Sequence, residues 1–368
     1  MKLLRKILLS APFSTLAIFI YKKQGGLNRS IWDGGRFNEK IEESINTFLS
    51  GEKKSNKKYL KKLEKDIILC YLKYGATPAE YFQMDYENAD SHKRSLLLTN
   101  YHKDTVLIKE EGFDNLKILR NKYLFYKKLG EYFYRDVCLV NNAEDFKNFA
   151  KFFENHKSFI VKNVNGKCAV GTKIVKDSKE SAQKVFDSII LELNKNDFND
   201  GYLLEELIVQ DSRIAQFNPS SVNTIRLHTF IKDGKFYAPW AIFRTGRKGS
   251  FVDNTHAGGV FAKVDTKNGF VCTNAIDEKN NSFKTHPDSH MQYEGFEIPE
   301  WNSLLNLAEK CHRKLMEEGK HKYIGWDFAL SDKGWVLVEG DWARIGCECI
   351  DKLGRRKAFD NYVIGGKK

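Results

Sequence analysis

Long antiparallel hairpins constrain the fold of this chain more than any other feature of its sequence. Residues 222–231 and 235–244 alternate apolar and polar side chains, and an Asp-Gly dipeptide typical of tight hairpin turns joins them. A second alternating pair, 322–330 and 335–341, lies near the C-terminal end. Strands joined by short turns form antiparallel sheets, which excludes a doubly wound parallel fold.

Helical periodicity fills much of the remaining chain. Apolar residues recur at spacings of three and four, and the helices predicted from this pattern are 37–49, 58–73, 79–85, 91–101, 122–129, 143–154, 178–193 and 303–318. Shorter strands are predicted at 137–140, 159–162, 173–175, 202–210, 259–264 and 269–273, the last two as a further hairpin. Helices mingled with antiparallel strands predict the α+β class, with a mostly helical region over residues 23–117. A chain of 368 residues, of which 42% are hydrophobic, is long enough for two or three domains.

The charge balance of the chain is basic. It has 60 Lys and Arg against 48 Asp and Glu, a formal net charge of +12, and lysines are densest between residues 53 and 65. A solvated helix face explains that stretch, and an acidic partner is the alternative. No RNA- or DNA-binding motif accompanies it, so no nucleic acid is expected. Seven cysteines without a complete set of metal-ligand spacings indicate a reducing compartment.

The N-terminal segment, residues 1–22, is apolar with basic ends. Residues 1–6 are basic, and 7–21 are almost wholly apolar with a central proline. Three interpretations stay open: a packed N-terminal helix, a peripheral membrane foot, or a secretion signal without a clear cleavage site. We expect a cytoplasmic protein, to which the second interpretation adds contact with the inner face of the membrane.

Three carboxylates are predicted to converge on the last hairpin. Asp327 lies between Gly325 and Ala329, on the face opposite the large apolar side chains, and Glu339 and Asp341 share a face of the second strand. Like charges this close are unfavourable unless a cation neutralises them, and carboxylate oxygens are ligands that Mg²⁺ prefers. We therefore predict a magnesium site, and three solvated acids are the alternative.

A strand followed by a glycine-containing loop is a candidate phosphate site. The predicted strand 159–162 ends in Lys162, and Gly166 and Gly171 follow in a small, polar loop. Backbone N–H groups in such loops and a lysine ammonium bind phosphate oxygens. A glycine-rich hairpin with an outward-reaching lysine is the alternative. The spacing does not match a Walker loop.

Two acids, Glu205 and Glu206, interrupt the apolar strand predicted at 202–210. Strand backbone at this point can pair with the edge of an adenine ring. An ordinary edge strand is the alternative interpretation.

Cations and amides gather around the longer hairpin. Arg226 lies on the polar face of its strand, Arg244 ends the partner strand, and Asn254 and His256 follow shortly after. Guanidinium and amide groups of this kind hold phosphate or carboxylate. His256 can equally be a buried structural histidine.

Taken in order, these motifs resemble the ATP-grasp superfamily from about residue 121 to the C-terminus. The run 251–259 followed by 325–341 looks like the ribosomal-protein glutamate ligase branch. Residues 74–82 together with 221–226 look like the sugar-transfer-associated ATP-grasp group.

The resemblance implies a fold and a set of roles. Two α+β subdomains, residues 118–200 and 201–368, would grip ATP between antiparallel sheets. In the superfamily the third metal ligand is usually Asn, whereas this chain has Asp341. By resemblance, the ATP-binding residues are Lys122, Lys162, Gly166, Gly171, Glu205, Glu206 and Ile208, the catalytic residues are Arg226, Arg244, Asn254 and His256, and the Mg²⁺ ligands are Asp327, Glu339 and Asp341.

The resemblance also implies an activity. ATP-grasp ligases phosphorylate a carboxylate, and an amine then attacks the acyl phosphate; the chain has no nucleophile triad that would suggest other chemistry. We therefore expect an ATP- and Mg²⁺-dependent carboxylate–amine ligase acting on a sugar or amino acid component of a surface polysaccharide, such as a capsule or envelope glycan. Two alternatives stay open: a kinase that phosphorylates a sugar or polyol hydroxyl, and a non-catalytic nucleotide-binding partner of a glycosyltransferase.

Overall fold

The structure is a computed structural model that describes residues 14–30, 35–166, 171–195, 200–253, 257–317 and 319–365. The chain forms two compact units. The helical unit comprises Met1–Glu110, Lys279–Asn281 and Arg344–Lys368, and the sheet unit comprises Glu111–Glu278 and Ser282–Ala343.

The helical unit consists of short helices around a core of apolar side chains. The helices are α2 (Ser14–Lys23), α3 (Phe37–Phe48), α4 (Gly51–Ser55), α5 (Lys57–Tyr74), α6 (Pro78–Gln83), α7 (Ser91–Leu96), α8 (Asn100–Glu111), α15 (Cys347–Asp351) and α16 (Arg356–Val363). The helices predicted at 37–49 and 58–73 are confirmed as α3 and α5. Among the described residues, no helix has both the length and the apolar character needed to cross a bilayer.

The prediction of a single helix at 91–101 is wrong, because this stretch forms the successive helices α7 and α8 with a break between them. The Thr99 hydroxyl donates a hydrogen bond to the carbonyl oxygen of Tyr74 (3.1 Å) and accepts one from the backbone N–H of His102 (3.3 Å). A threonine whose oxygen accepts from a following N–H starts a new helix. The tertiary contact with Tyr74 therefore sets the boundary.

The C-terminal residues group with the helical unit, so the subdomain predicted at 201–368 ends earlier, at residue 343. Arg356 donates a hydrogen bond from Nη2 to the carbonyl oxygen of Tyr74 at 2.9 Å. This contact ties α16 to the end of α5.

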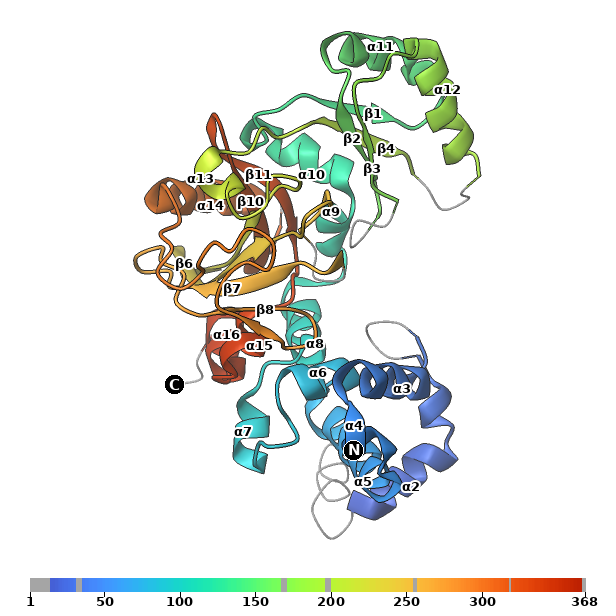
Figure 1. Cartoon of the computed structure of the whole chain (residues 1–368), viewed down its shortest axis with the longest axis vertical. Helices are drawn as coiled ribbons and strands as arrows, with labels where there is room; N and C mark the ends of the chain where they lie inside the picture. The colour runs from blue at the N-terminus through green and yellow to red at the C-terminus, as the bar shows by residue number, and fades with distance from the viewer. Residues whose placement is uncertain are drawn as a thin grey trace. The chain divides into compact units, whose positions relative to one another are not determined.

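The sheet unit contains two antiparallel sheets, which confirms the α+β class. The smaller sheet has the strand order β1-β4-β2-β3. Its strands are β1 (Val137–Val140), β2 (Phe159–Asn163), β3 (Lys173–Val175) and β4 (Tyr202–Glu206). Two helices, α11 (Phe146–Asn155) and α12 (Ala182–Leu193), cover one face of this sheet and bury a phenylalanine-rich core (Figure 1).

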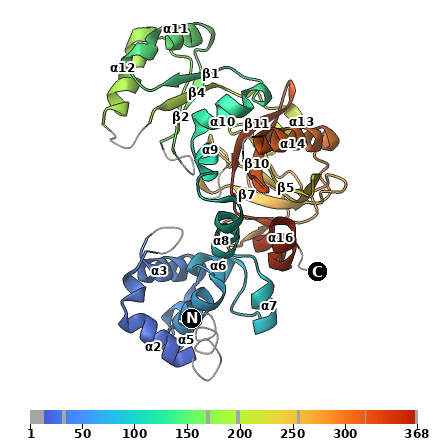
Figure 2. The same ribbon diagram turned by 180° about the vertical axis from the view of Figure 1, so that it is seen from behind.

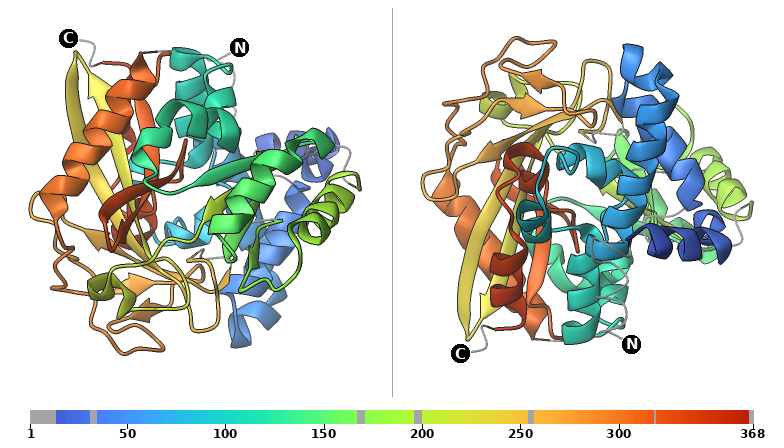
Figure 3. Two further views of the ribbon diagram at one scale, coloured as in Figure 1. Left: turned by 90° about the horizontal axis from the view of Figure 1, so that it is seen from above. Right: turned by 90° about the horizontal axis from the view of Figure 1, so that it is seen from below.

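The larger sheet has the strand order β11-β10-β5-β6-β7-β8-β9. Its strands are β5 (Thr224–Lys232), β6 (Lys235–Thr245), β7 (Val260–Val264), β8 (Ala275–Ile276), β9 (Ser282–Phe283), β10 (Tyr323–Ser331) and β11 (Gly334–Asp341). Helix α14 (Trp301–Met316), orange in Figure 3, packs against β5, β10 and β11. Both predicted long hairpins are confirmed as β5–β6 and β10–β11.

The predicted hairpin of 259–264 and 269–273 forms only in part. The first segment is β7, but the second contributes a single bridge between Val264 and Val271. The two hydrogen bonds beside this bridge are made, from the backbone N–H of Asp265 to the carbonyl oxygen of Phe270 (2.8 Å) and from that of Cys272 to Lys263 (2.9 Å). The ladder then ends, because the backbone N–H of Lys263 donates to the Thr273 hydroxyl at 3.0 Å instead of to a backbone carbonyl.

Two short helices connect to the larger sheet. Helix α9 (Leu116–Arg120) lies against β11, and α10 (Lys122–Leu129) lies against α14 (Figure 2). Residue Lys122 therefore begins its helix close to the strand that carries two of the predicted metal ligands.

Glu111 is buried where the sheet unit begins, and its protonation should affect stability. It accepts hydrogen bonds from the backbone N–H groups of Lys322 (2.9 Å) and Tyr323 (3.3 Å). Burial outweighs these donors and raises the pKa of Glu111 to about 8. The folded chain therefore holds a proton there that the unfolded chain loses near its ordinary carboxyl pKa.

We expect wild type to lose stability relative to Glu111→Gln as the pH rises from about 5 to about 8, by about 3 kcal/mol. Denaturant unfolding at both pH values measures this, with Glu154→Gln on the exposed surface of α11 as control. Parallel pH profiles for wild type and Glu111→Gln would contradict the assignment.

Candidate nucleotide-binding site

A cavity of about 520 Å³ is lined by residues from both sheets of the sheet unit. Most of the side chains predicted for the site meet there. They are Lys122, Lys162, Gly166, Glu205, Glu206, Ile208, Arg244, Asp327 and Glu339. Because these residues come from segments far apart in the sequence, their convergence is a property of the fold.

Lys162 enters the cavity from β2 and is held by a buried carboxylate. Its Nζ lies 2.8 Å from Oε1 of Glu205 on β4. Arg135 donates from Nε to the other oxygen, Oε2, at 2.9 Å and from Nη1 to the carbonyl oxygen of Leu337 on β11 at 2.7 Å. Arg135 thus links the smaller sheet to the strand that carries Glu339.

Glu205 remains ionised although it is almost fully buried. Burial alone would raise its pKa, but the charges of Arg135 and Lys162 outweigh burial and lower the pKa to about 2. The carboxylate therefore holds the Lys162 ammonium in place at any physiological pH. An ammonium fixed at the edge of a cavity is suited to binding a phosphate oxygen.

Lys122 connects the loop after β2 to the metal-ligand strand. Its Nζ donates to the carbonyl oxygen of Gly166 at 2.7 Å and lies 3.2 Å from Oε1 of Glu339. Its backbone N–H donates to the carbonyl oxygen of Val164 at 2.9 Å. The predicted loop and the predicted lysine therefore lie on the same side of the cavity.

Asp327 lies between two arginines at the end of the cavity on the larger sheet. Arg226 donates from Nε to its Oδ1 at 2.7 Å, and Arg244 donates from Nη1 to its Oδ2 at 3.0 Å. Burial opposes ionisation of Asp327, but the two guanidinium groups outweigh it and lower the pKa to about 2. The arginines are thus fixed beside a carboxylate rather than free to reorient.

Asp253 is a site residue that the sequence did not predict. Nη2 of Arg244 lies 2.9 Å from its Oδ1, and the Thr224 hydroxyl donates to its other oxygen. Burial raises the pKa of Asp253 more than Arg244 lowers it. The sequence did not predict Arg135 either. Neither Asp253 nor Arg135 belongs to a local sequence pattern, and the only signal for Asp253 was its position next to Asn254.

The donor set of the last hairpin fits a hard divalent cation. Asp327 and Glu339 are direct partners across β10 and β11, as predicted, and both line the cavity. Asp341, two residues after Glu339, lies opposite Gly325 of β10, and its side chain is exposed. Three carboxylates and no softer ligand match the preference of Mg²⁺. Ala343 fills the space beside Gly325, where an added Cβ would lie 2.5 Å from the Cβ of Ala343.

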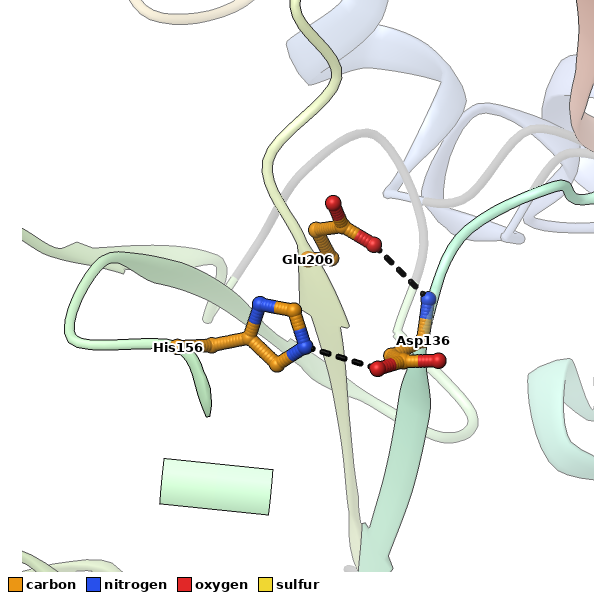
Figure 4. Close-up of side chains that lie close together, drawn as sticks. All are labelled: Asp136, His156 and Glu206. Atoms are coloured by element: carbon orange, nitrogen blue, oxygen red, sulfur yellow. Dashed lines mark hydrogen bonds and ion pairs between the residues drawn. The ribbon is translucent and has the colours of Figure 1, made fainter. Parts of the chain in front are cut away.

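Glu206, at the end of β4, also belongs to a polar cluster with Asp136 and His156 at the start of β1 (Figure 4). Its Oε2 accepts a hydrogen bond from the backbone N–H of Asp136 at 3.0 Å, and Nε2 of His156 lies 2.8 Å from Oδ2 of Asp136. One ligand atom from each residue lies within 4.8 Å of the others. These contacts fix the end of β4, from which the chain continues past the cavity as Leu207 and Ile208.

Some predicted site residues are not brought to the cavity in the part of the chain that the structure describes. Gly171 is not among the lining residues, and neither is Asp341. Asn254 and His256 lie outside the described residues. Arg226 reaches the site through its contacts with Asp327.

Lys162→Met is expected to weaken ATP binding about 10- to 100-fold, because a charge-assisted hydrogen bond to phosphate is lost. The fold should persist, since Arg135 still neutralises Glu205. Calorimetric titration with ATP measures the effect. Lys173→Met is the matched control, because Lys173 lies on the neighbouring strand and pairs with Glu192 on α12. Equal affinities for Lys162→Met and the control would contradict the phosphate role.

Comparisons with known proteins identify a family for most of the sheet unit. Residues 114–350 match the family described as sugar-transfer associated ATP-grasp. No curated protein matches the chain in sequence.

Several solved structures resemble the chain weakly. D-alanyl-alanine synthetase A from Vibrio cholerae is 12% identical, with 69% of this chain and 67% of that chain covered and a TM-score of 0.43. N5-carboxyaminoimidazole synthetase from Staphylococcus aureus, solved with ADP, is 11% identical over 70% of this chain and 55% of its own, with a TM-score of 0.44. A RimK domain ATP-grasp protein from Sphaerobacter thermophilus is 11% identical over 68% and 70%, with a TM-score of 0.41. The sequence match covers well over half of the chain, and the chain therefore belongs to the sugar-transfer associated ATP-grasp family.

Proposed function

We propose that the protein is an ATP- and Mg²⁺-dependent ligase that joins a carboxylate to an amine through an acyl phosphate. The observation that carries the proposal is the composition of the cavity. Two lysines meet two carboxylates of the last hairpin there, and Arg244 is fixed beside them. Phosphoryl transfer needs this combination of charges, since positioning and neutralisation supply most of the catalysis.

Each group has a role in the proposal. Lys122 and Lys162 bind phosphate oxygens, and the segment after Glu205 lies along the adenine. Asp327, Glu339 and Asp341 hold Mg²⁺, which neutralises phosphate charge when bound. Arg226 and Arg244 orient the γ-phosphoryl group and stabilise its developing charge, and Asn254 and His256 are further catalytic residues in the proposal.

The reaction balances in two steps. A carboxylate oxygen of the substrate attacks the γ-phosphorus, and the bond to the bridging oxygen breaks, which releases ADP. The amine nitrogen then attacks the acyl carbon, phosphate leaves with the electron pair of the C–O bond, and the amine loses a proton. Neither step requires a protein nucleophile.

The ion pairs of the site explain how its charges stay ordered before ATP binds. Lys122 pairs with Glu339, and Lys162 pairs with Glu205. We infer that Lys122 exchanges Glu339 for an ATP phosphate oxygen, which would leave Glu339 available to Mg²⁺, whereas Glu205 keeps Lys162 positioned. The more deeply buried pair of Lys162 and Glu205 therefore stays intact when ATP binds, whereas the more exposed pair of Lys122 and Glu339 separates.

The substrate belongs to surface polysaccharide assembly in our proposal, as a sugar or amino acid component of a capsule or envelope glycan. Support comes from the family description, which associates these proteins with sugar transfer. The reaction would take place in the cytoplasm, at the inner face of the membrane.

Product analysis by ³¹P NMR tests the proposal. The protein is incubated with Mg²⁺-ATP and pools of uronic acids and amino acids, with hydroxylamine as a surrogate amine. ADP and phosphate that appear only with a carboxylate, together with a hydroxamate, are the expected result. ADP with a new phosphoester signal would replace the ligase by a sugar or polyol kinase. Intact ATP despite measurable ATP affinity would favour a non-catalytic partner of a glycosyltransferase. The observation behind this alternative is Asp341, which stands where the superfamily usually has Asn.

A further inference from the structure

The helical unit carries a basic surface that the ATP site does not use. Its lysines lie on α4 and α5, all with exposed side chains: Lys53, Lys54, Lys57, Lys58, Lys61, Lys62 and Lys65. We call this set the lysine face. On α5 the spacing of three and four places its members on one side of the helix, while Leu63 and Ile67 are buried on the other.

The lysine face keeps its charge. Among the described residues, none of the α5 lysines of the face forms an ion pair with a carboxylate, and Glu64, the acid between Lys61 and Lys65, is engaged by Lys22 of α2 at 2.5 Å. Glu52 on α4 is the exposed acid nearest to the face in sequence. A strongly positive strip of this kind attracts a polyanionic surface.

Helix α2 adds exposed apolar side chains next to this charge. Leu16 and Phe19 are 47% and 56% exposed and lie three residues apart, while Ala17 and Ile18 are buried. The Lys23 ammonium lies 5.7 Å from the centroid of the Phe19 ring. Because Lys22 of α2 pairs with Glu64 at the edge of the lysine face, the apolar and basic features adjoin.

We propose that the lysine face together with Leu16 and Phe19 docks the helical unit on an anionic lipid bilayer. Exposed Leu and Phe side chains beside lysines match the interface of a bilayer, where apolar groups enter the acyl boundary and ammonium groups remain among phosphates. A nucleic acid or a soluble polyanion would use the lysines and leave the apolar pair in water. Residues 1–13 continue the basic and apolar composition in the sequence. The proposal goes beyond the ATP chemistry and stands independently of it.

Vesicle flotation of the full chain tests the proposal. We expect the protein to float with vesicles of phosphatidylcholine and phosphatidylglycerol at 7:3 and not with phosphatidylcholine alone, with binding weakened by salt. The variant K57Q/K58Q/K61Q/K62Q should bind at least tenfold more weakly. The matched control K147Q/K151Q/K179Q/K184Q removes four exposed lysines from the sheet unit and should bind like wild type.

The double variant L16S/F19S separates lipid from other polyanions. It should lose vesicle binding at least severalfold and, because both side chains are exposed, keep its thermal midpoint. Equal flotation of wild type and K57Q/K58Q/K61Q/K62Q would overturn the proposal, as would absence of flotation with anionic vesicles. Binding of dextran sulfate as tight as binding of vesicles, unchanged in L16S/F19S, would assign the surface to a soluble polyanion instead.

Discussion

Glu339→Gln is expected to lower Mg²⁺-dependent ATP turnover by about 10²- to 10³-fold without loss of the fold. The change keeps the size of the side chain but removes the charge that Mg²⁺ and Lys122 share. Because the Glu339 side chain is 43% exposed, loss of its charge leaves no buried group without a hydrogen-bond partner. The measurement is steady-state release of ADP over a range of Mg²⁺ concentrations, with circular dichroism to verify folding.

The control for this variant lies on the same hairpin. Asp332→Asn removes a carboxylate from the turn between β10 and β11, where the side chain is exposed. Turnover by Asp332→Asn should equal that of wild type. If Glu339→Gln retained wild-type turnover, the assignment of the metal site to this hairpin would be wrong.

Asp327→Asn is expected to lower the free energy of unfolding by about 3 kcal/mol at neutral pH. The substitution leaves Arg226 and Arg244 hydrogen-bonded but removes the charge that neutralises them, and Asp253 compensates for only one of the two. Denaturant titration monitored by tryptophan fluorescence measures the loss.

The pH dependence of the same variant gives a second, independent readout. Because the pKa of Asp327 is lowered to about 2, its contribution to stability is present above the ordinary carboxyl pKa and is lost as the pH falls through about 2. Wild type should therefore lose this contribution between about pH 4 and 2, and Asp327→Asn should not.

An exposed pair of the same chemistry is the control for stability. Arg247 and Asp288 form two contacts of 2.7 and 2.9 Å, but both side chains are partly exposed, at 36% and 24%. Asp288→Asn should cost about 1 kcal/mol or less. Equal losses from Asp327→Asn and Asp288→Asn would show that the buried pair has no special role.

The sequence predicted the hairpins because those depend on local pattern, in which a period of two fixes which side chains share a face. The register depends on more than the turn. The pairing of Ser331 with Gly334 would by itself place Asp327 opposite Val338, and a bulge between Asp327 and Phe328 brings it opposite Glu339. The convergence of Lys122 and Lys162 on that hairpin was available only from the family resemblance, since no local rule brings residues so far apart together.

The features that the sequence did not predict depend on tertiary contacts. The break before α8 is set by Thr99 bonding to Tyr74, and the hairpin after β7 ends early where the N–H of Lys263 bonds to the Thr273 hydroxyl. Arg135 lies just before β1, in no pattern, yet it neutralises Glu205 across the sheet. Long-range charge pairing of this kind leaves no signal in periodicity or composition.

A crystal structure with Mn²⁺ and a non-hydrolysable ATP analogue tests the central claim most directly, because Mn²⁺ is located by its anomalous scattering. We predict the nucleotide in the cavity between the two sheets, with phosphate oxygens on Lys122 and Lys162 and the ion bound by Asp327, Glu339 and Asp341. A nucleotide bound elsewhere, or an ion away from the last hairpin, would contradict the account.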